Sequence, residues 1–294
     1  MTKPLPHPQG RDPAVILSRA DDVIFLNPNG QKPPPSPGYD GPMHVGVDLG
    51  TAYTVLAVLD KDVNPIAGEY RFTQVVRDGL VVDYIGAVDI LREMKRNVEA
   101  RLGRPLTHAA SGYPPGVSLA EVRSTANVVE GAGMLCPELI PEPTAANSVL
   151  GITDGVIVDI GGGTTGIAIF TDGRVVYTAD EATGGTHMSL VIAGGAGISF
   201  EAAEAQKKDP AQQARLFPII RPVMEKMGTI VEKHIRGHNA QSITLVGGTS
   251  LFPGIDDVIQ EITGVPTRVA PHPLFVTPVG IAMHDQPDVY GFNN

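Results

Sequence analysis

The chain contains a single cysteine, Cys136, among its 294 residues. One cysteine cannot form an intramolecular disulfide, so the sequence is typical of a protein from a reducing cytoplasm. The N-terminus carries prolines where a signal peptide needs an apolar segment, and no apolar run reaches the roughly 20 residues of a membrane-spanning helix. We therefore expect a cytoplasmic protein without a membrane span.

Clusters of lysine and arginine are missing as well, and the formal net charge is −10. A groove for nucleic acid or a surface for anionic membranes needs a concentrated positive field. The composition therefore argues against both kinds of partner. The apolar fraction of 42% is ordinary for a globular protein.

The most informative feature that is present is an internal repeat. Residues 45–59 and 156–170 align without a gap, and each has an apolar run, an aspartate, a turn of small residues with threonine, and a second apolar run. The repeat predicts two β-hairpins at corresponding places in two similar half-domains. Each hairpin presents one carboxylate, from Asp48 or Asp159, together with backbone N–H groups. Such a pair predicts a clamp for a phosphate chain and its Mg²⁺.

The two turns and one later loop contain the predicted nucleotide contacts. Glycine lets a backbone approach a phosphate closely, and threonine adds a hydroxyl donor. A third motif follows the apolar run 243–246 and precedes a predicted helix at 255–262, where a base and ribose could lie against the backbone. Taken alone, a glycine-rich turn is equally compatible with a purely structural loop. The residues are Gly50, Thr51, Ala52, Gly161, Gly162, Gly163, Thr164, Thr165, Gly247, Gly248 and Thr249.

Elsewhere strands alternate with helices, which is the α/β pattern. Residues 1–42 form a proline-rich N-terminal arm in which 14–26 could make one short helix or strand. We expect one domain at 43–153 plus 273–286 and a second at 154–272. The predicted helices are 87–102, 119–131, 222–238 and one capped by Ser199, and the predicted strands include 68–70, 80–84 and 108–113.

In this order, the motifs resemble those of the actin, sugar-kinase and DnaK-type chaperone superfamily. Residues 48–51 look like its first phosphate loop, 159–165 like its second, and 245–253 like its adenosine loop. The resemblance implies a two-lobed actin-like ATPase (ribonuclease H-like) α/β fold with a nucleotide cleft between duplicated domains. It also implies ATP or ADP with Mg²⁺ as the ligand, held by Asp48 and Asp159.

Further positions acquire roles from the same resemblance. Residues 141–146 resemble the connecting segment of DnaK and MreB, which implies that Glu142 orients the attacking water; the alternative is a solvated carboxylate. Glu204 and Lys207 correspond to residues around ribose and adenine, or else to a plain solvated helix face. Gly184 and Gly185 match a turn at the cleft, beside His187, whose role the sequence leaves open.

Residues 158–169, 179–185, 187, 189–190 and 222–227 are also similar to the EutJ family of chaperone-like proteins from ethanolamine-utilisation operons. This implies a client-binding switch driven by slow ATP hydrolysis. The client would be an ethanolamine-utilisation enzyme or a component of a bacterial microcompartment. Chaperone relatives carry an acidic residue where this chain has Gly166, and no phosphate-contacting lysine can be placed. A non-hydrolysing, nucleotide-binding structural or filament-forming protein is therefore the alternative.

Overall fold

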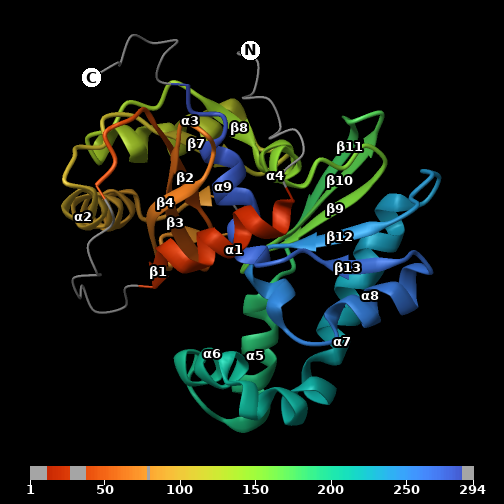
Figure 1. Ribbon diagram of the computed structural model, residues 1–294. Coiled ribbons are helices and arrows are strands. Elements are labelled where there is room, and N and C mark those ends of the chain that lie inside the picture. The colour runs from red at the N-terminus through yellow and green to blue at the C-terminus, as the bar shows by residue number, and fades with distance from the viewer. Residues whose placement is uncertain (1–11, 27–37, 78–79, 287–294) are drawn as a thin grey trace. The chain divides into compact units, whose positions relative to one another are not determined.

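The structure, a computed structural model, describes residues 12–26, 38–77 and 80–286, which divide into two compact units (Figure 1). Unit 1 comprises Met1–Gly151 and Phe275–Asn294, and unit 2 comprises Ile152–Leu274. Each unit has its own main sheet and its own helices. Within the described part of the chain, every helix is too short or too polar to cross a bilayer.

The main sheet of unit 1 has six strands in the order β1-β4-β3-β2-β7-β8. Strands β2, β3 and β4 form an antiparallel meander, whereas β7 and β8 continue from β2 in parallel. A separate two-stranded ribbon pairs β5 with β6. The bounds are β1 Ile24–Leu26, β2 Met43–Leu49, β3 Tyr53–Asp60, β4 Pro65–Phe72, β5 Val76–Arg77, β6 Leu80–Val81, β7 Ala110–Tyr113 and β8 Leu139–Pro141.

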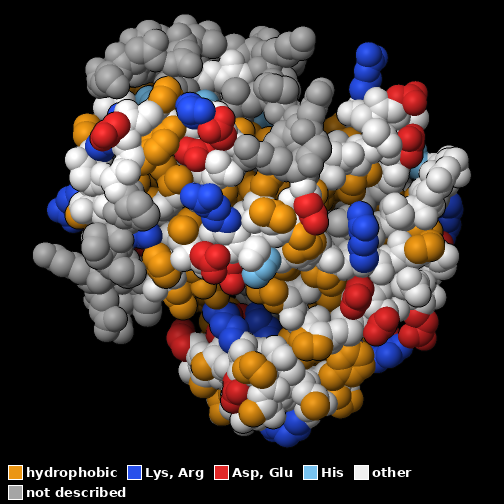
Figure 2. Space-filling model, in the orientation of Figure 1, with side chains coloured by type: hydrophobic (Ala, Val, Ile, Leu, Met, Phe, Trp, Pro, Cys, Tyr) orange, Lys and Arg blue, Asp and Glu red, His pale blue; other side chains and the backbone are white. Residues whose placement is uncertain are grey.

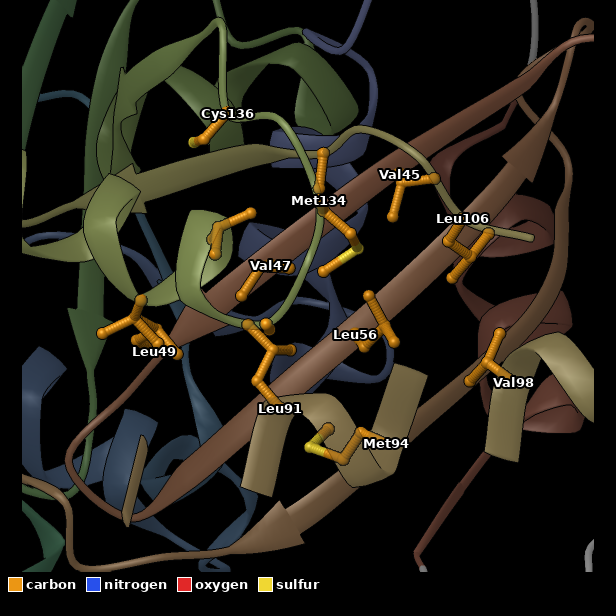
Figure 3. Packing of buried hydrophobic residues seen from close by; sticks show 14 of the residues in the cluster. Val45, Val47, Leu49, Leu56, Leu91, Met94, Val98, Leu106, Met134 and Cys136 are labelled. Carbon is orange, nitrogen blue, oxygen red and sulfur yellow. The ribbon is translucent and has the colours of Figure 1, made fainter. Parts of the chain in front are cut away.

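Helices cover both faces of this sheet. The main core lies on the face covered by α2 and α3, where Val47 and Leu56, paired across β2 and β3, pack with Leu91 and Met94 of α2 (Figure 3). Cys136 belongs to the same core; burial raises the pKa of its thiol to about 12, so it packs as an apolar side chain. The helices of unit 1 are α1 Pro13–Val23, α2 Tyr84–Leu102, α3 Leu119–Gly131, α4 Glu142–Leu150 and α9 Val276–Ala282.

Helix α9 lies against the opposite face of the sheet. A Cβ built on Gly46 of β2 would lie 2.5 Å from the backbone nitrogen of Ala282, and a Cβ on Gly280 would overlap the carbonyl oxygen of Ala145 in α4. Only glycine permits these close approaches. The C-terminal helix is therefore packed backbone to backbone between β2 and α4.

The N-terminal segment adds a helix and a strand to unit 1. Asp12 caps α1 by accepting from the Ala14 N–H at 2.9 Å, and β1 pairs in parallel with β4 to form one edge of the sheet. The Arg101 guanidinium donates to the carbonyl of Val23 and lies 4.6 Å from the centre of the Phe25 ring. This part of the proline-rich arm is thus anchored to the sheet.

Unit 2 contains a five-stranded sheet in the order β11-β10-β9-β12-β13. Its core forms where one face of β9, β10 and β12 packs against the helices. The elements are β9 Gly155–Ile160, β10 Thr165–Thr171, β11 Arg174–Glu181, α5 Gly185–Ala196, α6 Phe200–Lys208, α7 Pro210–Ile235, β12 Ile243–Val246, the 3-10 turn η1 Gly248–Leu251, α8 Ile255–Thr263, β13 Thr267–Val269 and the turn η2 Pro273–Phe275, which ends in unit 1.

The two sheets repeat one plan. In each, three antiparallel strands are followed by two strands parallel to the first, so β2-β3-β4-β7-β8 correspond to β9-β10-β11-β12-β13. Asp48 and Asp159 occupy the next-to-last positions of β2 and β9. Both predicted hairpins are confirmed, as is the duplication that the internal repeat predicted.

Several sequence-based boundaries were wrong. The strand expected at 80–84 is only two residues long, because Asp83 accepts from the Gly86 N–H at 2.9 Å and starts α2 at Tyr84. The helix expected at 222–238 begins at Pro210 and includes Pro218 and Pro222. Burial of the α7 face formed by Leu216, Ile220 and Met224 outweighs the interruption of the helix by proline.

Candidate functional site

In unit 1, the predicted first phosphate loop is a tight turn between β2 and β3. The Gly50 N–H donates to the carbonyl of Tyr53 at 3.0 Å, and a Cβ on Gly50 would lie 2.7 Å from that oxygen. Thr51 and Ala52 form the tip of the turn, and both are half-buried. The Ala52 carbonyl accepts from the Thr73 N–H at 3.0 Å. The turn is therefore held by its own backbone and by the segment that follows β4.

Glu142 lies at the same edge of the unit 1 sheet as Asp48. It is the first residue of α4, directly after β8, and the parallel strands β2, β7 and β8 all end at this edge. A Cβ on Gly112 of β7 would lie 3.3 Å from Cγ of Glu142. Carboxyl ends of neighbouring parallel strands are where open α/β sheets bind ligands. Unit 1 thus brings two of the predicted carboxylates to one sheet edge.

In unit 2, the second predicted phosphate loop is a similar tight turn. The Gly161 N–H donates to the carbonyl of Thr164 at 3.0 Å. Gly161, Gly162 and Thr164 are half-buried, and Gly163 is buried. Thr165 is fully buried, and its hydroxyl donates to the carbonyl of Thr183 at 2.6 Å. The Thr165 side chain therefore anchors the hairpin to the segment that follows β11.

The predicted second phosphate loop, the Gly184-Gly185 turn and the predicted adenosine loop converge within unit 2. The N–H groups of Gly185 and Thr186 donate to the carbonyls of Gly161 and Gly162, at 3.0 and 2.8 Å. The Thr249 hydroxyl, from η1, donates to the same Gly161 carbonyl at 2.8 Å. Segments far apart in the sequence thus form one cluster of backbone amides and carbonyls.

Glycine is required where these loops touch. A Cβ on Gly184 would lie 2.6 Å from the carbonyl oxygen of Gly162, and one on Gly185 would overlap the hydroxyl of Thr249. Gly247 has a φ of 86°, and a Cβ there would overlap the Asp159 carboxylate and lie 2.5 Å from the carbonyl of Ile160. The predicted adenosine loop therefore passes directly beside Asp159.

A second carboxylate, that of Asp180, lies beside Gly166, the position at which chaperone relatives carry an acidic residue. Gly166 of β10 pairs with Asp159 of β9 on one side and with Asp180 of β11 on the other. Residues paired across antiparallel strands project to the same face. A Cβ on Gly166 would lie 3.5 Å from Oδ1 of Asp180 and 3.9 Å from Cβ of Asp159. The glycine leaves a gap between two carboxylates on one face of the sheet.

Sequence reasoning missed Asp180. A hairpin after β10 could be expected to bring the second half of β11 opposite Gly166, but the exact partner depends on the register of the two strands. The β-bulge between Ile169 and Phe170 shifts this register by one residue. No sequence pattern indicates this shift in register, so Asp180 could be assigned as the partner of Gly166 only from the structure.

The predicted nucleoside pair, Glu204 and Lys207, forms a buried network beside the Gly184-Gly185 turn. Lys207 donates to Glu204, to the hydroxyl of Ser189 at 2.8 Å and to the carbonyl of Gly185 at 2.9 Å, while Lys208 reaches Glu204 at 3.0 Å. Burial lowers the pKa of Lys207, and Glu204 partly offsets this. Burial raises the pKa of Glu204, but Lys207, Ser189 and Lys208 outweigh it, so the net shift is downward. The pair is therefore a satisfied ion pair connected to the loop cluster.

His187 caps the helix that carries the cluster. Its Nδ1 accepts from the Gly184 N–H at 3.2 Å, at the start of α5.

Across residues 12–26, 38–77 and 80–286, no group of three or more acidic, histidine or cysteine side chains is arranged to hold a metal ion. Mg²⁺ is nevertheless commonly bound by one or two carboxylates with several waters. Asp48 in unit 1, and Asp159 with Asp180 in unit 2, fit that requirement.

Charged side chains of both signs lie on the visible surface. Figure 2 shows acidic and basic side chains interspersed over the visible face, with apolar side chains between them. The positive charge near the loop cluster comes from Lys207 and Lys208, both paired with Glu204.

Two families with the actin-like ATPase fold match parts of the chain. The profile of the family described as Cell division protein FtsA matches residues 156–280, and that described as MreB/Mbl protein matches residues 66–194. The structure of MreB5 of Spiroplasma citri bound to AMPPNP matches at a TM-score of 0.70 and 19% identity, covering 87% of this chain and 99% of that chain. At this identity the match shows the shared fold alone.

Other relatives are much more similar. Ethanolamine utilization protein EutJ of Salmonella typhimurium is 41% identical over 271 residues, which cover 89% of this chain and 94% of the relative. The crystal structure of EutJ from Carboxydothermus hydrogenoformans has a TM-score of 0.84 and 43% identity, and the match covers 93% of this chain and 100% of that chain. The chain has the actin-like ATPase fold and belongs to the EutJ family of ethanolamine utilization proteins.

Proposed function

We propose that this protein binds Mg·ATP through the duplicated hairpins and that nucleotide state controls its affinity for a protein client. The observation that carries the proposal is the convergence of the second phosphate loop, the Gly184-Gly185 turn and the η1 loop beside Asp159. Glycine-rich turns allow phosphate oxygens to approach the backbone closely. The fold that this chain shares with an AMPPNP-bound MreB supports the same assignment.

In this proposal the carboxylates hold hydrated Mg²⁺. The metal would supply charge neutralisation at the phosphates. Asp48 and Asp159 orient its water shell, and Asp180 contributes a further acceptor across the gap at Gly166. Asp180 would thereby replace the acidic residue that chaperone relatives carry at the position of Gly166. The turns at Gly50, Thr51 and Ala52 and at 161–165 bind the phosphates.

The remaining predicted residues receive the following roles. Glu142, at the sheet edge where β2 also ends, orients the attacking water. Glu204 and Lys207 support the nucleoside, and Gly247, Gly248 and Thr249 form the surface on which it lies. We propose slow hydrolysis, because the carboxylate set differs from that of the chaperone relatives at Gly166.

The client follows from the family. EutJ relatives carry ethanolamine utilization in their names, so we propose an ethanolamine-utilisation enzyme or a bacterial microcompartment component as the client. ATP turnover would alter the closure of the protein around nucleotide and so its affinity for that client, in the manner of a cytoplasmic chaperone.

A second candidate is a nucleotide-binding structural or filament-forming protein without turnover. The glycine at position 166 favours it, because no side chain from that position can assist the attacking water. Phosphate release measured together with light scattering separates the two. Steady release without scattering supports the switch, whereas nucleotide-dependent scattering without release supports the filament.

Calorimetric titration tests the nucleotide site directly. We expect Mg-dependent ATP binding by the parent protein and at least about tenfold weaker binding by Asp159→Ala, because a carboxylate that holds the metal is lost. Asp257→Ala, which removes an exposed carboxylate of the same unit, is the matched control and should bind as the parent does. Undiminished affinity of Asp159→Ala would refute the assignment.

A further inference from the structure

Unit 2 has an open apolar groove of about 350 Å³ between α5 and α7. Leu190 and Val191 of α5 form one wall, and Pro222 and Val223 of α7 form the other. Leu190 is 54% exposed and Val191 is 40% exposed. Single exposed aliphatic side chains are ordinary, but adjacent ones that line a hollow are typical of binding surfaces.

One positive charge marks the rim of this groove. Lys226 lines it one helical turn beyond Pro222, and none of the lining residues is acidic. Glu225, the neighbour of Lys226, instead accepts from Arg221 at 2.8 Å. Within the described residues no ion pair involves Lys226. In a protein with a net charge of −10, the groove therefore combines an apolar floor with an available cation.

The groove and the loop cluster share structural elements. Thr183 lines the groove, and its carbonyl accepts from the Thr165 hydroxyl of the second phosphate hairpin at 2.6 Å. His187 also lines the groove, and its Nδ1 accepts from the Gly184 N–H. A displacement of the first turn of α5 would therefore change both the groove and the loop cluster.

We infer that this groove is the docking surface for an amphipathic helix of a partner protein, with aliphatic side chains on one face and a carboxylate that pairs with Lys226. An open groove of this volume accepts two or three aliphatic side chains spaced i, i+3 and i+4 along a helix, whereas it would leave a small ligand largely in water. Charge complementarity at Lys226 favours an acidic partner. The associated coupling, in which bound nucleotide changes the affinity of this groove, rests on the proposed function.

A designed peptide tests the groove without knowledge of the natural partner. The probe is a fluorescein-labelled helical peptide with leucines at i, i+3, i+4 and i+7 and a glutamate beside them; its twin carries lysine in place of that glutamate. Binding is followed by fluorescence anisotropy on the full chain without nucleotide. We expect the glutamate peptide to bind at least about fivefold more tightly than its twin, and Leu190→Ser to weaken it about tenfold.

Charge reversal makes the test specific. Lys226→Glu should lose affinity for the glutamate peptide and gain affinity for the lysine peptide. Val176→Ser and Arg174→Glu alter exposed residues of β11 in the same unit and serve as controls that should bind as the parent does. The inference is overturned if the parent fails to bind, if Lys226→Glu does not reverse the preference, or if the controls lose as much affinity. It is also overturned if sedimentation shows a dimer that Leu190→Ser dissociates, because the occupant is then a second copy.

The coupling has its own readout. With saturating Mg·ATP we expect the affinity for the glutamate peptide to change at least about threefold, and the Lys226→Glu variant to bind ATP as the parent does. Peptide binding that is unaffected by bound ATP would leave the docking surface standing and refute the coupling. A protein that binds the peptide but no ATP would refute the proposed function and spare the docking surface.

Discussion

Substitution of Gly185 by alanine tests the contact that joins the loop cluster. The added Cβ would overlap the Thr249 hydroxyl and lie 3.2 Å from Cγ2 of the same residue. Thr249 must therefore rotate, and its hydrogen bond to the Gly161 carbonyl, 2.8 Å long, is lost. The predicted second phosphate loop then loses one of the bonds that hold it against α5 and η1.

The cost can be worked out from these contacts. A lost hydrogen bond costs about 1 kcal/mol, and an off-rotamer threonine costs about another 1 kcal/mol. Alanine recovers up to about 0.5 kcal/mol at the first helical turn through its lower unfolded-state entropy. We expect a net loss of about 1.5 kcal/mol, which lowers Tm by about 3–6 °C. ATP affinity should fall roughly tenfold, because binding must restore the displaced loop.

Differential scanning calorimetry and calorimetric ATP titration measure both effects. Gly194→Ala is the matched control, since it lies in the same helix and a Cβ there meets nothing within 4 Å. In a Thr249→Ala background, Gly185→Ala should cost little more, because the overlapping hydroxyl is gone. If Gly185→Ala is as stable as Gly194→Ala and binds ATP equally well, the reasoning about this contact is wrong.

Three further changes probe the chemistry, the unit 1 packing and the pH dependence. Glu142→Gln should keep ATP affinity within about twofold and slow phosphate release at least about tenfold; equal release rates would reject its role. Gly280→Ala should destabilise the protein by about 2 kcal/mol or more in thermal unfolding, because its Cβ overlaps the Ala145 backbone oxygen; an unchanged Tm would contradict that packing. Since the folded-state pKa of Glu204 is lowered by Lys207, its contribution to stability is present above the unfolded value of about 4.3 and is lost as pH falls through the lower folded value. Glu204→Gln should thus flatten the acid side of the stability profile, and an equally steep profile would exclude this ion pair as its source.

Much of the fold could be predicted from local patterns in the sequence. The hairpin strands, α3, β12 and the cap at Ser199 were predicted correctly, because alternation, capping residues and glycine stops act over a few residues. The start of α7 was missed because proline usually ends a helix. Here Leu216 and Met224, buried on either side of Pro218 and Pro222, continue the helix. That burial depends on strands far away in the sequence.

The sequence by itself determined the duplicated hairpins, the two aspartates at matching positions and the glycine-rich turns, because each is written in consecutive residues. Only the tertiary structure decided that Asp180 faces Asp159 across Gly166, that Thr165 turns its hydroxyl to Thr183, and that Thr249 bonds to Gly161. The physical reason is that strand register and loop packing depend on contacts between distant segments, and no local pattern records which partners those segments will meet.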